Sequence, residues 1–408
     1  AAVSDFSPTF GLNMRQFDMM MKIYKILSQK YDVVCTNPPY MGGSGMNAKL
    51  SEFVKSKFPD SKSDLFACFI EKCGQLAKPH GFYAMITQHA FMFLSSYENL
   101  RKKLMQKTTV NMAHLGARAF DEIGGEVVQT TAFVMTGHIK DYKGTYARLV
   151  DTVGENEKRD LFLSGDKRFA AKQENFSKIP GSPVAYWVSE NFIRAFENGR
   201  LLGEIASSKQ GIATADNNRF LREWYEVNVE KILFDCSTHE ESKTSPAKWY
   251  PYNKGGEFRK WYGNNDYVVN WQYDGAELRN FKKSVIRNPN FYFMPCFSWS
   301  LISSSVAAFR YKPKGHIFDV AGMSCFSNDK LHYLLALCNS SCAMKVLEVI
   351  APTINYQCGD IANIPVIIPD SDEVENHVKE LVKDNIDSCK TDWDYYEVSW
   401  DFEKHPLI

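Results

Sequence analysis

The alternation of short apolar runs with amphipathic stretches over the first 150 residues is the feature that most constrains the fold. Runs of strand length occupy residues 31–35, 82–86, 110–115 and 126–135, and apolar residues recur at helical spacing over residues 65–76 and 95–105. Strands that alternate with helices through short connections are typical of an α/β sheet. We therefore predict an α/β fold in which the strand at residues 31–35 is buried and ends at a proline pair.

Length and composition set further limits. The 408 residues give room for two or three domains. No apolar run reaches the roughly 20 residues that a membrane span requires, so we predict no membrane segment. The ten cysteines form neither a CxxC pair nor a cluster with histidines. This pattern predicts reduced thiols, no metal site and a cytoplasmic location.

The chain has 48 basic and 48 acidic residues, but their distribution is uneven. Residues 248–315 contain eleven basic and four acidic residues, a net charge of +7, together with many aromatic side chains. Residues 370–408 contain twelve acidic and four basic residues, a net charge of −8. These shifts, and a polar stretch rich in glycine and proline, predict four segments. They are a first domain at 1–150, a connecting region at 151–200, a second domain at 201–368 and an acidic helical tail at 369–408.

Asn37-Pro38-Pro39-Tyr40 follows the first predicted strand, at the end where α/β sheets open onto a crevice. Each proline fixes its own φ near −65° and keeps the preceding residue extended. The Asn37 side-chain oxygen and the Pro38 carbonyl would then be rigid acceptors for both hydrogens of an exocyclic amine, which favours a nucleophilic nitrogen. Tyr40 offers a flat surface to a flipped base. The motif predicts methyl transfer to an amine, although a proline pair can also simply end a strand.

The residues that follow the motif favour the first interpretation. Residues 41–47, 59–66, 86–94 and 114–120 are similar to the blocks that follow the catalytic motif in N6-adenine DNA methyltransferases. With residues 399–402 and 405–407, the series resembles the PglX group of BREX phage-exclusion methyltransferases over nearly the full chain. The tetrapeptide alone would be shared with enzymes that methylate RNA or protein glutamine.

The resemblance implies the C-terminal part of a Rossmann-like class I methyltransferase sheet, followed by an α+β target-recognition domain. It implies a catalytic role for four residues, namely Asn37, Pro38, Pro39 and Tyr40. It also implies that Tyr40 and Phe120 stack on the target base, and that a second set lies near S-adenosylmethionine, namely Asp64, Leu65 and Phe66. From the residues alone, Phe120 could equally be a core aromatic and Asp64 a carboxylate at a helix N-terminus.

The cofactor site is expected to be incomplete. In the family that the chain resembles, a glycine-rich turn and an acidic strand end lie upstream of the catalytic motif. Only 36 residues precede Asn37, and residues 10–13 do not form such a turn. Gly42, Gly43 and Gly45 do not follow a strand in the nucleotide-binding order and are interpreted as a lid. We therefore expect the chain to be the C-terminal portion of a larger enzyme.

The second half of the chain has the features of a DNA reader. Residues 348–357 and 359–366 resemble the end of target-recognition domains in adenine methyltransferases and restriction specificity subunits. The basic, aromatic window before them suits phosphate contacts and base stacking, although a solvated surface around an aromatic core would look similar. The candidate phosphate-binding residues are Lys209, Arg219, Lys254, Arg259, Lys282, Lys283 and Arg287. Cys296 follows a proline, as a cytosine-methylating nucleophile would, but is interpreted as a buried thiol.

Together these features predict a site-specific adenine-N6 DNA methyltransferase. It would transfer a methyl group from S-adenosylmethionine to a flipped adenine in duplex DNA, within phage defence or restriction-modification. Double-stranded DNA and other proteins of those systems are the expected partners. Two alternatives stay open: a DNA-binding specificity fragment that is inactive on its own, and an RNA or protein-glutamine amino-methyltransferase.

Overall fold

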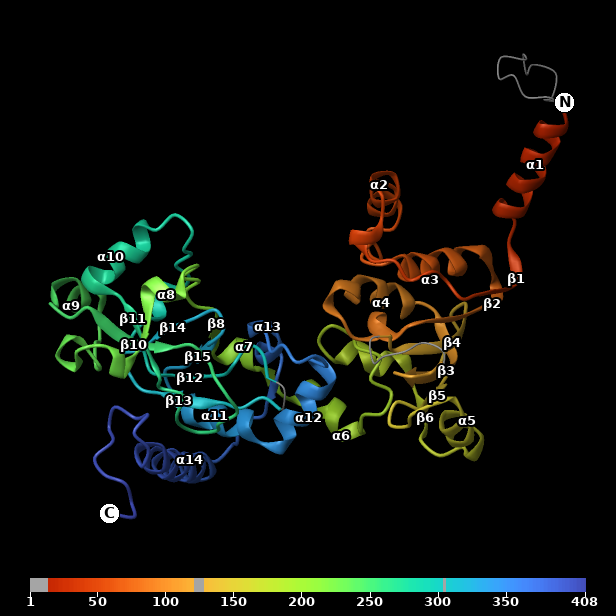
Figure 1. Ribbon diagram of the computed structural model, residues 1–408. Coiled ribbons are helices and arrows are strands. Elements are labelled where there is room, and N and C mark those ends of the chain that lie inside the picture. The colour runs from red at the N-terminus through yellow and green to blue at the C-terminus, as the bar shows by residue number, and fades with distance from the viewer. Residues whose placement is uncertain (1–13, 121–127, 304–305) are drawn as a thin grey trace. The chain divides into compact units, whose positions relative to one another are not determined.

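The computed structural model describes residues 14–120, 128–303 and 306–408. The chain divides into two compact units, residues 1–187 and 188–408 (Figure 1). Each unit has its own hydrophobic core, the first built mainly around a six-stranded sheet and the second around two four-stranded sheets. The predicted α/β class of the first half is confirmed.

The helices and strands of the first unit follow the predicted alternation closely. Its helices are α1 (Met14–Ser28), α2 (Ala48–Lys57), α3 (Leu65–Leu76), α4 (Glu98–Leu104) and α5 (Glu155–Ser164). Its strands are β1 (Tyr31–Thr36), β2 (Ala77–Gln88), β3 (Thr108–Gly116), β4 (Thr130–Thr136), β5 (Gly144–Arg148) and β6 (Arg168–Ala171).

The sheet of the first unit has the strand order β1-β2-β4-β3-β5-β6. β1 and β2 are parallel, and β4 runs antiparallel to both of its neighbours, β2 and β3. β1 forms one edge of the sheet, and the expectation that this strand is buried is wrong: none of its residues is buried, and Val33 is 60% exposed. The carboxyl ends of β1, β2 and β3 lie at the same end of the sheet. The Asn-Pro-Pro-Tyr segment begins at this end of the sheet, directly after β1.

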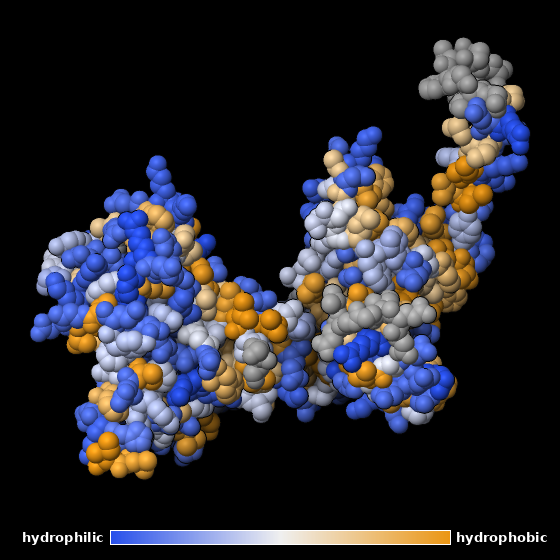
Figure 2. Space-filling view, viewed as in Figure 1, coloured by the Kyte–Doolittle hydropathy of each residue, from blue (hydrophilic) through white to orange (hydrophobic). Residues whose placement is uncertain are grey.

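The two faces of this sheet differ in their packing. On β2, Tyr83 and Met85 are buried in the core that α3 and α4 cover, whereas Ala84 and Ile86 point to the opposite face. There a hollow of about 770 Å³ crosses β1 to β5, and many of its lining side chains are small or β-branched, among them Ala84, Ile86, Ala113, Ala132, Val134, Thr145 and Ala147. α1 buries none of its residues, and Figure 2 shows hydrophobic side chains along its surface.

The expected connecting region at 151–200 differs from the structure. Residues 155–164 form α5, and β6 pairs with β5 in the first sheet, so the first unit continues to residue 187. The glycines that suggested a linker have local roles instead. Gly154 and Gly165 flank α5 and adopt φ values of 86° and 81°, a backbone region that glycine enters without steric cost.

The second unit mixes short strands with helices. Its helices are α6 (Glu190–Asn198), α7 (Leu202–Ile205), α8 (Asn217–Phe220), α9 (His239–Thr244), α10 (Gln272–Asn280), α11 (Leu331–Asn339), α12 (Ser341–Ile350), α13 (Cys358–Ala362) and α14 (Asp372–Asp394). Its strands are β7 (Arg200–Leu201), β8 (Ser207–Lys209), β9 (Leu221–Glu223), β10 (Trp249–Asn253), β11 (Tyr267–Asn270), β12 (Cys296–Ser298), β13 (Arg310–Lys312), β14 (Ile317–Phe318), β15 (Ser324–Phe326) and β16 (Pro365–Val366).

The two larger sheets of this unit have the orders β14-β10-β11-β9 and β13-β12-β15-β8, and β7 pairs with β16 in a third. Aromatic side chains such as Trp271, Tyr250 and Tyr292 fill a large core cluster of the unit. The acidic segment forms α14, which packs on α11 and is tied to it by the ion pair of Lys330 with Glu375 at 2.5 Å. Residues 369–408 are thus part of the second unit.

The apolar stretch 331–347 forms two helices because Ser340 ends α11 and caps α12, its side chain accepting a hydrogen bond from the Ala343 amide at 3.1 Å. Among the described residues, no single helix has the length and apolar composition of a membrane span. α11 and α12 reach those limits only as a pair, bent by 72°.

A buried arginine holds the first unit together where its chain leaves regular structure. Arg101 on α4 is 1% exposed and donates to the carbonyls of Gly181, Phe91 and Leu94 at 2.7–2.9 Å. These bonds join α4 to the segment that follows β6. We infer that this cation substitutes for the backbone donors that a strand or helix would provide.

Replacement of Arg101 by Met should lower the free energy of unfolding of the first unit by about 3 kcal/mol, because the Phe91 and Gly181 carbonyls lose their side-chain donor and the Leu94 carbonyl retains the Tyr97 amide. Denaturant unfolding followed by fluorescence measures this loss. Lys102→Met is the control: Lys102 is exposed and, among the described residues, pairs only with Glu98, so its change should stay within about 0.5 kcal/mol. Equal effects of the two variants would contradict the role given to Arg101.

Candidate functional site

The candidate catalytic motif, Asn37 to Tyr40, lies where β1 leaves the sheet. Cys35 and Thr36 still pair with β2, and the extended segment Asn37 to Tyr40 follows directly. Pro38 is buried, whereas Asn37 is exposed and lines the hollow on the open face of the sheet. The buried proline anchors the segment, and the amide of Asn37 remains accessible to a ligand.

The Asp64 carboxylate fixes the chain immediately after the motif. Its Oδ1 accepts hydrogen bonds from the backbone amides of Met41, at 3.0 Å, and Phe66, at 3.2 Å. The second bond caps the N-terminus of α3, which is the helix role considered for Asp64 from the sequence. The Leu65 amide also donates to the Met41 carbonyl at 3.0 Å. The start of α3 therefore determines where the motif ends.

The glycine-rich segment after the motif is attached at its base. The Gly43 amide donates to the Ser63 carbonyl at 3.2 Å, and Gly42 forms an isolated bridge with Asp64. Gly43–Gly45 is a short 3-10 turn, and Ser44 at its centre is exposed. The expected lid is thus anchored on the Asp64 side.

Tyr40 is half-buried and oriented by α3. Its ring meets that of Phe66 edge-on, with centroids 6.1 Å apart and planes at 81°. Burial, and then the negative charge of Asp64, raise the pKa of the Tyr40 hydroxyl. The phenol is therefore neutral near pH 7, and its ring packs against the core of the first unit.

The residues expected near a cofactor have internal partners. Asp64 Oδ1 is occupied by two backbone amides, Phe66 is fully buried, and Leu65 packs against Val54 and Phe58 beneath α2. Of the polar atoms in these three side chains, only Asp64 Oδ2 has no hydrogen-bond partner among the described residues. These residues position the catalytic segment, and on their own they do not fit a complete cofactor site.

Two neutral histidines connect the ends of β2 and β3 across β4. His89 Nδ1 lies 2.8 Å from His114 Nε2, and His114 Nδ1 lies 3.1 Å from the Tyr186 hydroxyl. Burial lowers the pKa of His89 to about 4 and that of His114 to about 3, the latter helped by nearby His89. The His89 amide also donates to the Gln129 carbonyl at 2.9 Å. No sequence pattern predicts this series of hydrogen bonds, because His89, His114 and Tyr186 are far apart in the sequence.

Phe120 is half-buried in the bend after β3. Residues 121–127, which include Gly124 and Gly125, lie outside the described residues. No contact between the rings of Phe120 and Tyr40 is recorded, so the second stacking surface stays a prediction.

Several of the seven predicted phosphate-binding residues have internal partners. Arg219 pairs with Glu277 at 2.7 Å, and Lys254 pairs with the buried Asp319 at 3.4 Å. Arg259 pairs with Asp392 on α14 at 3.0 Å and lies over the Trp393 ring. Lys209 lies over the Phe291 ring at 5.2 Å. Each of these four cations therefore has a partner within the protein itself.

Lys282 and Lys283 differ from that group. Both are exposed, directly after α10, and neither has an ion pair or hydrogen bond within the described parts of the chain. Arg287, a few residues on, has a buried Nη1 atom for which the described residues provide no partner. Lys282 and Lys283 are thus the exposed candidates without an internal partner among the described residues, and the DNA-binding role of all seven stays a prediction.

Two further basic residues of the +7 window are buried. Arg310 is 1% exposed, and Lys312 is fully buried with its amine 2.9 Å from the carbonyls of Gly263 and Asn264. Burial, and then the charge of Arg310, lower the pKa of Lys312 to about 7. Cys296 is also buried, as the sequence suggested. Part of the local charge is therefore structural and cannot contact a ligand.

Known proteins resemble the chain at three levels. The family model described as Eco57I restriction-modification methylase matches residues 8–120. The adenine-specific methyltransferase PglX of Lacticaseibacillus casei (strain Zhang) is 42% identical over 408 residues, covering 95% of this chain and 33% of PglX. The adenine-specific methyltransferase BrxX of Escherichia coli O9:H4 (strain HS) is 44% identical over 390 residues, covering 94% of this chain and 31% of BrxX. The chain therefore spans about a third of the length of these relatives.

The fold also has a counterpart among solved structures. The Type IIL restriction-modification enzyme MmeI, solved in complex with DNA, superposes with a TM-score of 0.56 at 12% identity. The match covers 91% of this chain and 50% of MmeI. The match extends over both units, so a six-stranded mixed sheet followed by a mixed α/β unit is a known fold.

Acid should destabilise the first unit through the histidine pair. The folded-state pKa values of about 4 and 3 lie below the unfolded value of 6.5, so the unfolded chain binds more protons between these limits. Stability present above pH 6.5 is then lost as the pH falls toward 4, by about 2 kcal/mol for each histidine, or about 4 kcal/mol for the pair, between pH 7 and 5. Denaturant midpoints at the two pH values measure this loss.

The variant His89→Gln/His114→Gln should flatten this pH dependence, since glutamine does not titrate. His80→Gln, at an exposed position, is the matched control and should leave the dependence unchanged. A double variant with the acid sensitivity of the original protein would show that other groups are responsible.

Proposed function

Because the chain is a relative of the adenine-specific methyltransferases PglX and BrxX over nearly its whole length, we propose that it carries the target-base side of an N6-adenine DNA methyltransferase and its DNA-recognition region. The single observation that carries the proposal is the Asn37–Tyr40 segment at the carboxyl end of β1, with Asn37 accessible and Pro38 buried. We propose the methyltransferase activity for a complete enzyme that contains this chain.

In this proposal the chain's own residues prepare the adenine amine. The Asn37 side-chain oxygen and the Pro38 carbonyl accept its two hydrogens, which draws the nitrogen lone pair out of conjugation with the ring. The proline rings fix these acceptors before the base arrives, so little reorganisation is needed. The fixed ring of Tyr40 stacks on the base after it leaves the duplex, and Phe120 contacts its other face.

S-Adenosylmethionine is the proposed methyl donor, and part of its site would come from sequence outside this chain. Two observations support this division. The residues around Asp64 are engaged internally, and the sheet face that Asn37 shares is open and apolar. The isolated chain would then bind DNA without turnover. This corresponds to the alternative of a DNA-binding specificity fragment that is inactive on its own.

The second unit is proposed to bind duplex DNA, within a restriction-modification or phage-defence system whose other proteins would be further partners. The exposed cations after α10 support this role. The alternative of an RNA or protein-glutamine methyltransferase shares the tetrapeptide. It is disfavoured because the similarity to PglX and BrxX, which are adenine-specific methyltransferases, extends over the second unit as well as the first.

Asn37→Ala in the complete enzyme should lower adenine methylation by about 100-fold or more, because one of two amine acceptors is lost. Methylation sequencing of DNA from expressing cells measures the activity, and gel-shift titration checks that DNA affinity is retained. Asn198→Ala, at the exposed end of α6, is the matched control and should be fully active. Full methylation by the Asn37 variant would refute the proposed chemistry.

Reversal of Lys282 and Lys283 to Glu should weaken binding to all duplex sequences alike. Each phosphate contact adds about −0.9 to the slope of log affinity against log salt, so losing two contacts flattens the slope by about 2. Fluorescence anisotropy with a labelled random duplex at several salt concentrations measures both quantities.

The charge-matched control reverses Lys383 and Lys404, which are exposed on and after α14. This change alters the net charge equally but should reduce affinity far less, since it removes no proposed contact. If both double reversals act alike, the effect is one of net charge and the assignment of the surface is wrong.

A further inference from the structure

α10 begins with a turn of the wrong hand. Tyr273, Asp274 and Gly275 have φ/ψ values of 54°/50°, 57°/41° and 74°/28°, all left-handed. Glycine adopts this region freely, but each of the other two residues costs about 1–2 kcal/mol there. Gly275 alone would account for a single left-handed position, so two strained residues remain to be explained.

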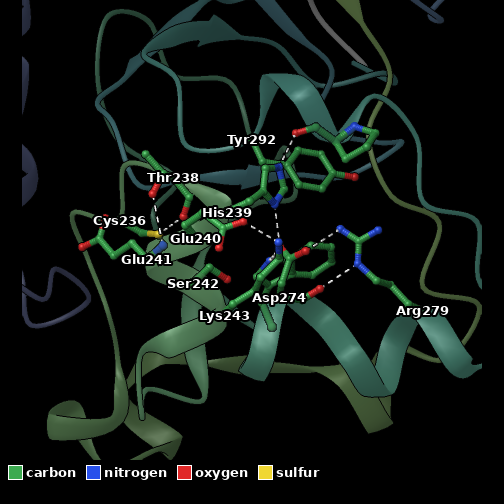
Figure 3. A network of polar contacts seen from close by, with 12 residues as sticks. Cys236, Thr238, His239, Glu240, Glu241, Ser242, Lys243, Asp274, Arg279 and Tyr292 are labelled. Carbon is green, nitrogen blue, oxygen red and sulfur yellow. Dashed lines mark hydrogen bonds and ion pairs between the residues drawn. The ribbon is translucent and has the colours of Figure 1, made fainter.

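The turn is held by side chains from several elements (Figure 3). Asp274 Oδ1 accepts hydrogen bonds from His239 Nδ1 on α9, at 2.5 Å, and from the Trp271 indole, at 3.2 Å. Arg279 donates its Nη2 to Asp274 Oδ2 at 3.1 Å and its Nε to the Asp274 carbonyl at 2.7 Å. His239 Nε2 is fixed in turn by the Pro289 carbonyl at 3.0 Å.

The turn also packs on a rigid base. Trp271 is fully buried, and a Cβ atom on Gly275 would lie 2.5 Å from its ring. The Gly275 amide donates to the Trp271 carbonyl at 2.9 Å. Since hydrogen bonds and packing fix the same few residues, the strained backbone is over-determined and does not relax.

The residue that this arrangement presents outward is Tyr273. Its side chain is 59% exposed and has no hydrogen bond, ion pair or ring contact within the described residues. Its own burial therefore does not offset the strain. Strained positions that are held from outside cluster at ligand-binding sites.

The charge around the turn suits nucleic acid. Lys282 and Lys283 follow the end of α10, the element that begins with the Tyr273 turn, and both are exposed. Figure 1 places α10 on the opposite side of this unit from the acidic α14. The same element thus carries an aromatic side chain suited to a base edge and is followed by two cations suited to phosphates.

We propose that Tyr273 is a specificity-determining residue that contacts base edges in duplex DNA, held in position by the Asp274–His239–Arg279 network. The inference rests on the proposed DNA recognition by the second unit and adds the residue that reads sequence. Lys282 and Lys283 contribute affinity that is independent of sequence.

The test is selection of bound duplexes from a random-sequence library by the 408-residue chain, followed by sequencing. Tyr273→Gly should lower the enrichment of the wild-type motif about tenfold, because a base contact is lost, and should leave affinity for unselected duplex and its salt slope unchanged. Its thermal midpoint should be equal or higher by up to about 4 °C, because glycine removes left-handed strain. A purely structural tyrosine would instead lower that midpoint.

Two comparisons make the test decisive. Tyr225→Gly changes a tyrosine of similar exposure, 58%, beside Glu223 and Glu226, and should keep the motif. Asp274→Ala should lower both the midpoint and the enrichment, since it removes the support of the turn. An unchanged motif in Tyr273→Gly, or a wild-type chain that binds DNA without enriching a motif, overturns the role of Tyr273. A wild-type chain that binds no duplex overturns the proposed DNA recognition itself.

Discussion

The parallel pairing of β1 with β2 is the constraint on which the catalytic edge depends. Its register sets Cys35 opposite Ala84 and Thr36 opposite Met85, so β1 ends while β2 continues to Gln88. The chain that leaves β1 is then received by Asp64, whose carboxylate joins the end of the motif to the start of α3. The strand register determines where the segment starts, the prolines fix its backbone conformation, and the Asp64 cap determines where it ends.

Elements coded by their own residues could be predicted, and those that depend on distant partners could not. β1 and α3 lie where the apolar run and the helical spacing placed them, within one residue at each end. β6 was missed because the four residues Arg168–Ala171 have no strand pattern of their own and become a strand by pairing with β5. The chain from His89 through His114 to Tyr186 was missed for the same reason.

Charge in the sequence overstated charge at the surface. Lys312 and Arg310 were counted in the basic window, yet both are buried and donate to backbone carbonyls. In the first unit, Arg101 and Lys158 do the same, the latter reaching the carbonyls of Leu115, Leu149 and Thr152 at 2.6–2.8 Å. A long cation can satisfy several irregular carbonyls at once, which makes its burial tolerable. Basic windows therefore predict nucleic-acid surfaces only after such residues are removed.

Residues with a strained, positive φ differ in whether burial of their own side chain offsets the cost. Phe293 also has a positive φ, of 69°, but its ring is 2% exposed, so burial of a large apolar side chain offsets the cost. Tyr273 has the same backbone sign with most of its side chain in solvent. Its strain is maintained by Asp274, His239 and Arg279, all polar groups that a simpler turn would leave free to interact with water. In our proposal, this network holds an exposed aromatic in a costly conformation because Tyr273 makes its contact with DNA.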